Sequence, residues 1–423
     1  SLVGSEMCIR DSNVTVERTH ITVGQADIDD WTSGGSKDIT LQEARTLTFA
    51  PNGGSGTIAG DKVFEGATTS LPYGNALTPP SGKTFVGWNT LPRGGGEFYA
   101  AGSTLTMPAG DLTLYAQWSG DGSAEDNPIL ITDAQGMKDI GASDKSRKKH
   151  YRLCNDLVLD DWEAIYYDYG GGQGEGFSGT FDGGGHTVTL NGGKPIRADF
   201  NNGISGYFIS LFACIEGEVR RLRVDGQITV DGTENETYYA GGICGVNYAG
   251  TVTDCISNVT VTATGKMNSL YAGSIAGWNG AGSIFNCYAT GKIESAAIVQ
   301  DVFLGGIAGA NNNCIANCAA LNSNISGKDG QTNTYICRIA YNTSANIVNN
   351  YASATSAAFT DKGLNKPNGA DCDAKPVASW WKEPDRWADS YTIPSGSTKT
   401  LTPWDFGTTW EVTDGNLPVL RRE

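Results

Sequence analysis

One apolar pattern recurs with a fixed stride in the middle of the chain and constrains the fold more than any other feature. Five aliphatic residues follow one another at intervals of 32 between Tyr207 and Ser356: Leu211, Ile243, Ile275, Ile307 and Ile339. A second ladder comprises Val219, Val252, Ile284, Ile315 and Ile347, and a third comprises Ile228, Val261, Ile293 and Ile325. Self-similarity at such a period is typical of repeat proteins whose units stack. Three ladders predict three short strands per repeat, each with one face turned inward.

Stacked in this way, the segments predict a parallel β-helix. Equivalent side chains of neighbouring rungs would lie about 4.8 Å apart. Each inward Ile or Val would contribute roughly 1.5–3 kcal/mol on burial, and each rung would contact only its neighbours. We therefore expect a mainly β fold with a right-handed, three-faced solenoid over residues 128–356.

A polar column accompanies the second ladder, two residues further along: Asp254, Asn286, Asn317 and Asn349. Stacked Asn amides can hydrogen-bond to one another, and Asn tolerates the left-handed backbone of a bend. We interpret the column as turn-forming and not as catalytic.

The cysteines follow the same stride. Cys255, Cys287 and Cys318 each lie three residues after an aliphatic residue of the second ladder, while Cys244 matches small or apolar residues in the other repeats. This favours buried free thiols over disulfides. Cys314 and Cys318 have a spacing of four but lack a second Cys or His pair nearby, which argues against a zinc site because such a site needs four ligands. We predict no metal and no cofactor.

Composition limits the class of protein and its possible partners further. Gly is 57 of 423 residues and the net charge is −16. Strong acidity argues against nucleic acid and against anionic membranes as partners. The sequence contains no run of 18 or more apolar residues that would span a membrane. Its length suggests two or three units.

The first twelve residues, 1–12, have neither the basic nor the apolar region of a signal peptide. They resemble translated sequencing-adapter stretches, so we exclude them, with Cys8, from fold reasoning and expect the true N-terminus and any export signal to be missing. Residues 13–45 are a remnant or linker, in which Val14–Val16 and Ile21–Val23 alternate like strands.

Residues 46–119 carry another set of motifs. An Asn-Gly-Gly turn begins at Asn52, Leu71-Pro72 follows, and then come Phe85-x-Gly-Trp-Asn-Thr, a glycine triplet and a terminal Leu-Tyr-Ala-Gln-Trp ending at Trp118. This unit resembles the Listeria–Bacteroides repeat, also called the internalin B-repeat. The resemblance implies a small β-grasp-like module, a spacer or binding element of secreted or surface-anchored bacterial proteins. We favour a core role for Trp88 and Trp118 over a role as ligand platforms.

A Gly/Ser/acidic linker over residues 120–127 leads into a short helix, with Thr132 as its expected N-cap and Met137 and Ile140 as its apolar face. We expect this helix to cover the first rung of the solenoid. Insertions interrupt the first full rungs at 160–176 and 191–206. The part of the first that is rich in Tyr and Gly, Tyr166–Gly174, is expected to be an exposed loop, and loops are where function concentrates.

The ladder region also resembles a known repeat. The sequences Ala240-Gly-Gly-Ile-Cys-Gly245 and Gly282-Ser-Ile-Phe-Asn-Cys-Tyr-Ala-Thr-Gly291 are similar to the GLUG repeat. The similarity covers about residues 125–356 and implies a β-helical region of a bacterial surface protein. It weakens at Arg221 and at Cys337-Arg338, as expected of capping rungs.

The C-terminal stretch, 357–423, loses the repeat and gathers aromatic residues: Trp380, Trp381, Trp387, Trp404, Phe406 and Trp410. We expect it to seal the far end of the solenoid; a sugar-binding aromatic patch is the alternative.

Catalytic motifs are sparse. The three histidines, His20, His150 and His186, lie outside any His-Glu-x-x-His pattern. Asp182, Asp225 and Asp254 are the carboxylates that a β-helical polysaccharide lyase or glycoside hydrolase would need, but their repeat positions differ. We expect His186, close to Asp182, to support a turn.

The sequence therefore predicts a non-catalytic adhesin or scaffold fragment, extracellular or on the cell surface and monomeric. Its expected ligands are glycans or surface proteins. The carbohydrate-cleaving enzyme remains the alternative.

Overall fold

The computed structural model describes residues 2–3, 6–7, 15–16, 19–22, 40–170, 173–233, 235–328, 333–342, 346–353, 369–383, 385–392 and 398–422. The fold is mainly β, with 53% strand and 4% helix, and contains a β-solenoid of about six turns. The chain divides into two compact units, residues 1–119 and 120–423. The adapter-like stretch 1–12 lies largely outside the described residues.

The first unit is built around one mixed sheet, whose order is β11-β10-β13-β5-β4-β3 with β7 paired to β5. The strands of this sheet are β3 (Thr15–Val16), β4 (Thr19–Thr22), β5 (Thr40–Ala50), β7 (Asp61–Phe64), β10 (Thr84–Asn89), β11 (Phe98–Ala100) and β13 (Leu112–Ser119). Short pairs flank it: β1 (Leu2–Val3) with β2 (Glu6–Met7), β6 (Ser55–Gly56) with β9 (Leu77–Thr78), and β8 (Thr68–Ser70) with β12 (Thr104–Thr106). The two strands expected before residue 24 are present. The β-grasp arrangement itself stays a prediction.

The core role of the two tryptophans in this unit is confirmed. Trp88 is 0% exposed and Trp118 9%. Their indole N–H groups donate to the carbonyl oxygens of Pro72, at 2.8 Å, and Pro51, at 2.9 Å. Phe85 packs edge-on against both rings. Each indole therefore has its polar atom satisfied inside the protein, as a buried Trp requires.

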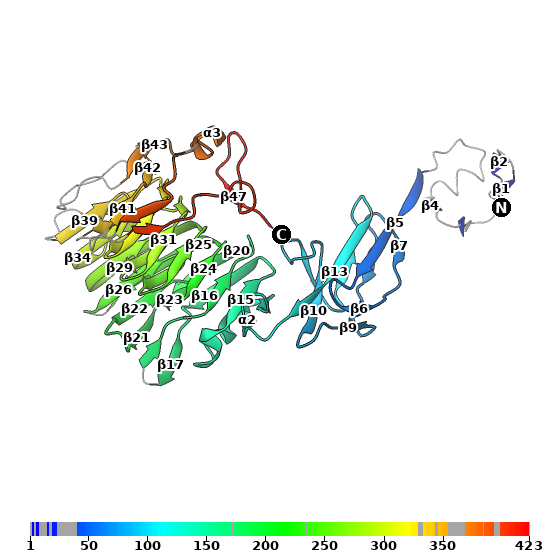
Figure 1. Cartoon of the computed structure of the whole chain (residues 1–423), viewed down its shortest axis with the longest axis horizontal. Helices are drawn as coiled ribbons and strands as arrows, with labels where there is room; N and C mark the ends of the chain where they lie inside the picture. The colour runs from blue at the N-terminus through cyan, green and yellow to red at the C-terminus, as the bar shows by residue number, and fades with distance from the viewer. Residues whose placement is uncertain are drawn as a thin grey trace, which may run out of the picture. The chain divides into compact units, whose positions relative to one another are not determined.

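The second unit is the solenoid, in which three sheets run along the stack (Figure 1). Sheet 1 contains β14 (Ile129–Ile131), β15 (His150–Leu153), β19 (Thr180–Asp182), β24 (Glu218–Arg220), β28 (Thr251–Thr253), β31 (Ser283–Phe285), β36 (Cys314–Ala316) and β41 (Asn346–Val348). Sheet 3 contains β23 (Phe212–Ile215), β27 (Cys244–Asn247), β30 (Ala276–Asn279), β35 (Ala308–Asn311) and β40 (Tyr341–Asn342).

Sheet 2 is the largest, with 17 strands. Its strands are β16 (Leu157–Glu163), β17 (Tyr167–Gly170), β18 (Gln173–Glu175), β20 (Thr187–Lys194), β21 (Ile196–Phe200), β22 (Ser205–Ile209), β25 (Arg223–Gly232), β26 (Thr237–Gly241), β29 (Ile256–Gly273), β32 (Tyr288–Ala289), β33 (Ile293–Ser295), β34 (Ile298–Gly305), β37 (Ala319–Ala320), β38 (Ile325–Gly327), β39 (Asn333–Cys337), β42 (Tyr351–Ser353) and β43 (Ala370–Cys372).

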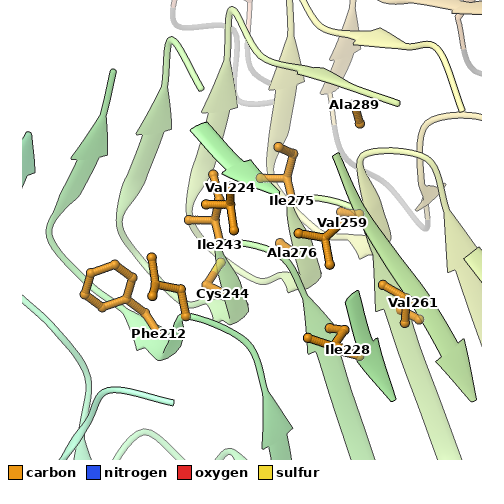
Figure 2. Close-up of a cluster of buried hydrophobic side chains, with 14 of the residues drawn as sticks. Phe212, Val224, Ile228, Ile243, Cys244, Val259, Val261, Ile275, Ala276 and Ala289 are labelled. Carbon is orange, nitrogen blue, oxygen red and sulfur yellow. The ribbon is translucent and has the colours of Figure 1, made fainter. Parts of the chain in front are cut away.

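The apolar ladders form the core of the solenoid. Second-ladder residues pair in register, Val219 with Val252 and Val252 with Ile284. Val261 of the third ladder pairs with Ile228 and with Ile293. Figure 2 shows Ile243 and Ile275 among the side chains gathered in this core.

The expected three strands per repeat hold for one turn, which contains β27, β28 and β29, but the next turn contains five, β30 to β34. The first ladder does not lie on a strand in these turns: Ile243 falls in the bend between β26 and β27, and Ile275 in the bend between β29 and β30. Both side chains are nevertheless fully buried. A period-32 apolar residue therefore marks a repeated inward position, whether on a strand or at a corner.

The glycine before each first-ladder corner has a steric reason. A Cβ on Gly241 would overlap the carbonyl oxygen of Cys244, and equivalent overlaps would occur at Gly273 and Gly305. The chain turns from sheet 2 into sheet 3 at these points, and only glycine allows such close backbone approach.

The helix before the stack is α2 (Ala134–Asp139). Its N-cap is Asp133, whose carboxylate accepts from Gly136 N at 2.8 Å, so the expectation of Thr132 as the cap is wrong. The backbone is extended at Asp133, which places that residue at the boundary. Met137 and Ile140 are fully buried and join the core cluster of the first rungs, as the predicted apolar face requires. A short 3₁₀ helix (Ser146–Lys148) follows.

The polar column adopts the predicted left-handed backbone: Asp254, Asn286, Asn317 and Asn349 have φ values of 50–55°. Arg221, which replaces Asn in the first segment, has φ 51°. The column therefore forms the same bend in successive turns.

The aromatic C-terminal stretch was predicted to seal the far end of the stack. Its described part instead runs back along the side of the solenoid (Figure 1). We call the described part of residues 378–422 the strap. It includes α3 (Ala378–Trp381), β44 (Ser390–Thr392), β45 (Thr398–Thr400), β46 (Trp410–Glu411) and β47 (Val419–Leu420). Residues 357–368 of the expected cap lie outside the described residues.

The polar column holds the strap in reverse order. Asn349 donates to Arg386 O, Asn317 donates to Ala388 O at 2.8 Å, and Asn286 donates to Thr402 O at 2.7 Å. Further along, Asp254 accepts from Trp410 Nε1 at 3.0 Å. The position of the strap along the side has a physical reason. The outward amides of the column provide a line of hydrogen-bond partners for it. The sequence pattern indicated only the turn-forming role of these residues.

Candidate functional site

The carboxylates of the enzymatic alternative are each engaged by a partner. Arg221 donates to both oxygens of Asp182, at 2.9 and 2.7 Å. Burial opposes ionisation of Asp182, but the hydrogen bond and charge of Arg221 outweigh it and keep the pKa of this carboxyl below its usual value. Arg223 Nε lies 2.8 and 3.0 Å from the two oxygens of Asp225. Neither carboxylate is poised as a general acid or base.

Asp254 is held differently. Burial raises its pKa, and hydrogen bonds from Trp410, Thr253 and Asn286 oppose the shift only in part. Arg221 and Asp254 occupy successive positions of the same corner column. Asp182 lies one position before that column, in register with Arg220, and is bound by Arg221. Each of the two carboxylates is therefore already engaged.

His186 does support a turn, though not with the expected neighbour. Its backbone N–H donates to Gly183 O at 2.9 Å, and its Nδ1 lies 3.0 Å from Asp156. Arg422 of the strap also binds Asp156, with both distances 2.8 Å. Partial burial of Asp156 opposes ionisation, but hydrogen bonds from His186 and Arg422 outweigh it and hold its pKa far below the usual range. His186 is fully buried, so this cluster anchors the strap to an early rung.

The nine described cysteines are free thiols, and eight of them are buried, as predicted. Burial raises the pKa of Cys154 and Cys372 to about 12. Cys314 packs beside Leu401 of the strap while Cys318 belongs to the solenoid core, so the two do not converge. Among the described residues, no group of three or more His, Cys, Asp or Glu side chains is placed to hold a metal ion.

The two insertions form strands rather than free loops. The first makes the β17–β18 hairpin, with residues 171–172 at its tip outside the described residues, and the second makes β21 and β22. Tyr169 is 52% exposed, but Phe200 and Ile204 of the second insertion are buried against Phe208 and Tyr239. The second insertion therefore covers part of the solenoid surface.

The strap tryptophans form an aromatic cluster against the side of the solenoid. Trp404 lies at its centre, with ring centroids 4.4 Å from Trp410, 4.9 Å from Trp381 and 5.2 Å from Trp387. Trp404 Nε1 donates to Asn317 O at 2.8 Å, and Tyr288 of β32 donates its hydroxyl to Pro418 O at 2.7 Å. Most of these aromatic rings are therefore buried between the strap and the solenoid, where they form a hydrophobic core.

One side of the cluster is open. A cavity of about 540 Å³ is lined by Trp387, Trp404 and Phe406, with charged side chains around them. Phe406 is half-buried and lies nearly parallel to Trp404, with centroids 6.0 Å apart and planes at 16°. The charged lining consists of Lys382, Glu383, Asp385 and Asp389. An aromatic floor with polar groups converging on it is typical of a small-molecule site.

Two further ladders follow the same stride but were not predicted from the sequence. One is a stack of aromatic rings on sheet 2: Phe208, Tyr239, Tyr271, Phe303 and Tyr335. Successive centroids are 4.6–5.2 Å apart. The other is a buried amide column in sheet 3, where Asn247 donates to Asn279 at 2.9 Å and Asn279 to Asn311 at 2.6 Å. Aligning all residue types at the 32-residue period, not only the aliphatic ones, would have found both.

Comparison with known proteins supports the two resemblances. Residues 46–117 match the family model of the Listeria-Bacteroides repeat domain, and residues 268–294 match the GLUG motif. These surface-protein repeats, together with the β-solenoid, fit a bacterial surface or secreted protein. Among the described residues, no helix is long and apolar enough to cross a membrane.

Individual relatives are distant or short. A protein named as a candidate Gly-rich membrane protein from Evansella cellulosilytica is 54% identical over 37 residues, which are 9% of this chain and 4% of that relative's length. A crystal structure of a candidate immunoglobulin A1 protease from Bacteroides ovatus is 19% identical with a TM-score of 0.41, covering 66% of this chain and 93% of that one.

Proposed function

We propose that this chain is a non-catalytic, adhesin-like scaffold of a bacterial surface or secreted protein, in which a rigid solenoid supports a surface that binds glycans or proteins. The engagement of the candidate carboxylates is the observation that carries the proposal. Asp182 is bound by Arg221 and Asp254 by Trp410. A glycosidase needs two carboxyl groups free to protonate or attack the substrate.

The architecture supports the same proposal. The ladders give a stiff body, since each rung is held to the next by paired strands and buried aliphatic side chains. The acidic chain, with a net charge of −16, disfavours nucleic acid as a ligand. Extracellular or cell-surface placement and a monomeric state belong to the proposal.

The test is a panel of soluble polysaccharides incubated with the full chain, with reducing ends and unsaturated uronate products measured in parallel with binding. The expected result is saturable binding without product. Cleavage that disappears in Asp182→Ala or Asp254→Ala would overturn the proposal. Because both substitutions remove structural contacts, Asp182→Asn and Asp254→Asn, with circular dichroism to verify the fold, separate lost chemistry from lost structure.

A further inference from the structure

We propose that the cavity on the strap, between Trp387, Trp404 and Phe406, is a glycan-binding site selective for neutral or amino-bearing pyranoses over acidic sugars. The inference rests on the proposed function and adds to it a location and a ligand class. Its volume of about 540 Å³ falls in the usual range of small-molecule sites, about 300–1,000 Å³.

The floor of the cavity is apolar and held in place. Trp387 and Trp404 lie 5.2 Å apart at 28°, and their indole N–H groups donate to Trp381 O, at 2.9 Å, and to Asn317 O, at 2.8 Å. Rings fixed in this way lose little side-chain entropy when a ligand arrives. A pyranose carries a flat patch of C–H groups, and an exposed aromatic face is its natural complement.

Phe406 is the ring that a ligand reaches most easily. Trp387 is 8% exposed and Trp404 6%, whereas Phe406 is half-buried. Its ring is nearly parallel to that of Trp404, at 16°, so it extends the aromatic surface toward solvent. Phe406 is therefore the side chain whose loss removes ligand contact with the least damage to the core.

The rim of the cavity selects by charge. Asp385 and Asp389 are exposed carboxylates, Glu383 is paired with Arg386, and the Lys382 ammonium group of the lining donates to Val412 O at 3.4 Å. Ionised carboxylates only accept hydrogen bonds, so they suit the hydroxyl and ammonium donors of a sugar. They repel the carboxylate of a uronic or sialic acid, because like charges brought together cost binding energy.

The experiment measures binding of the full chain by intrinsic tryptophan fluorescence and by saturation-transfer NMR. The probes are cellotriose, maltotriose and chitosan trimer on the neutral or amino side, and trigalacturonate and 3′-sialyllactose on the acidic side. We expect a trimer of the first group to bind at least tenfold more tightly than either acidic probe. Phe406→Ala should weaken that binding tenfold or more. Asp389→Asn should reduce the ratio between the affinities for neutral or amino-bearing probes and for acidic probes.

Val419→Ala is the matched control, because Val419 is an exposed strap residue, 47% accessible, beside a different cavity of about 440 Å³. It should leave binding unchanged. Equal binding of acidic probes, or binding that neither cavity variant alters, would overturn the inference while leaving the scaffold proposal intact. Absence of binding to all five probes by a folded chain also overturns it. Turnover of any probe would instead refute the non-catalytic function.

Discussion

Asn317 offers the sharpest test of how the strap is held. Its side chain donates to Ala388 O and accepts from Ala388 N, both at 2.8 Å, and its backbone sits at φ 55°. Asn317→Ala would leave both Ala388 groups without these partners, at about 1–3 kcal/mol each. Alanine at a left-handed position adds about 1–2 kcal/mol. We take the lower end of these ranges, about 3 kcal/mol, because Ala388 is only half-buried.

The assay is urea unfolding, followed by tryptophan emission and by circular dichroism. Five of the ten tryptophans, Trp404 among them, lie in the strap, so the emission is weighted toward docking of the strap, while the ellipticity reports mainly on the strands. Asn317→Ala should lower the midpoint of the fluorescence transition more than that of the ellipticity transition, because the ladders remain in place.

Asn317→Gly is the control that separates the two contributions. Glycine adopts the left-handed backbone without strain but provides no side-chain hydrogen bonds. Asn317→Gly should recover less than half of the free energy of unfolding that Asn317→Ala loses. Full recovery in the glycine variant, or a loss below about 1 kcal/mol in the alanine variant, would show that the amide contacts do not hold the strap and would refute the reasoning.

Four further outcomes follow from the structure. Trp404→Phe loses the indole N–H bond to Asn317 O and should cost about 1–3 kcal/mol in urea unfolding; no change would contradict the bond. Because burial raises the folded-state pKa of Asp254, the contribution of this one carboxyl to stability should fall as pH rises above about 4. Asp254→Asn should lack that component and be more stable at pH 7, and a less stable variant would count against it. Ile284→Ala, at a fully buried ladder position, should cost about 2–5 kcal/mol, against about 0.5 kcal/mol or less for the control Ile298→Ala at a 58% exposed site. Native-state alkylation with peptide mapping should label Cys337, which is partly exposed, before the eight buried described cysteines; uniform labelling would argue against the packed core.

The solenoid was predictable from the sequence because its stabilising contacts repeat. Ile284 pairs with Val252 and Ile315, and each pair lies one period apart, so one residue's role predicts that of the next. The number of strands per turn was not predictable in the same way. Apolar period alone does not distinguish a residue on a strand, such as Val252, from one in a corner, such as Ile243.

The strap and its cavity were not predictable because their contacts have no period. Trp404 meets Asn317 across 87 residues, and nothing in either local sequence indicates the other. The sequence also explained Asn317 fully as a turn residue, so it did not indicate that the amide of this residue binds the strap. The aromatic composition of the C-terminal stretch did indicate a packed or sugar-binding surface; only the packing shows which rings remain open.

The strap has a consequence for how the chain folds. A solenoid is dominated by contacts between adjacent turns and can in principle fold turn by turn as it is synthesised. The bond from Arg422 to Asp156 joins residues 266 apart, and closing so long a loop is slow. We therefore expect folding in two stages, with a fast assembly of turns and a late docking step. A chain caught between the two would expose the aromatic side of the solenoid, where Tyr288 and Ile256 pack against the strap, and that species is where aggregation should begin.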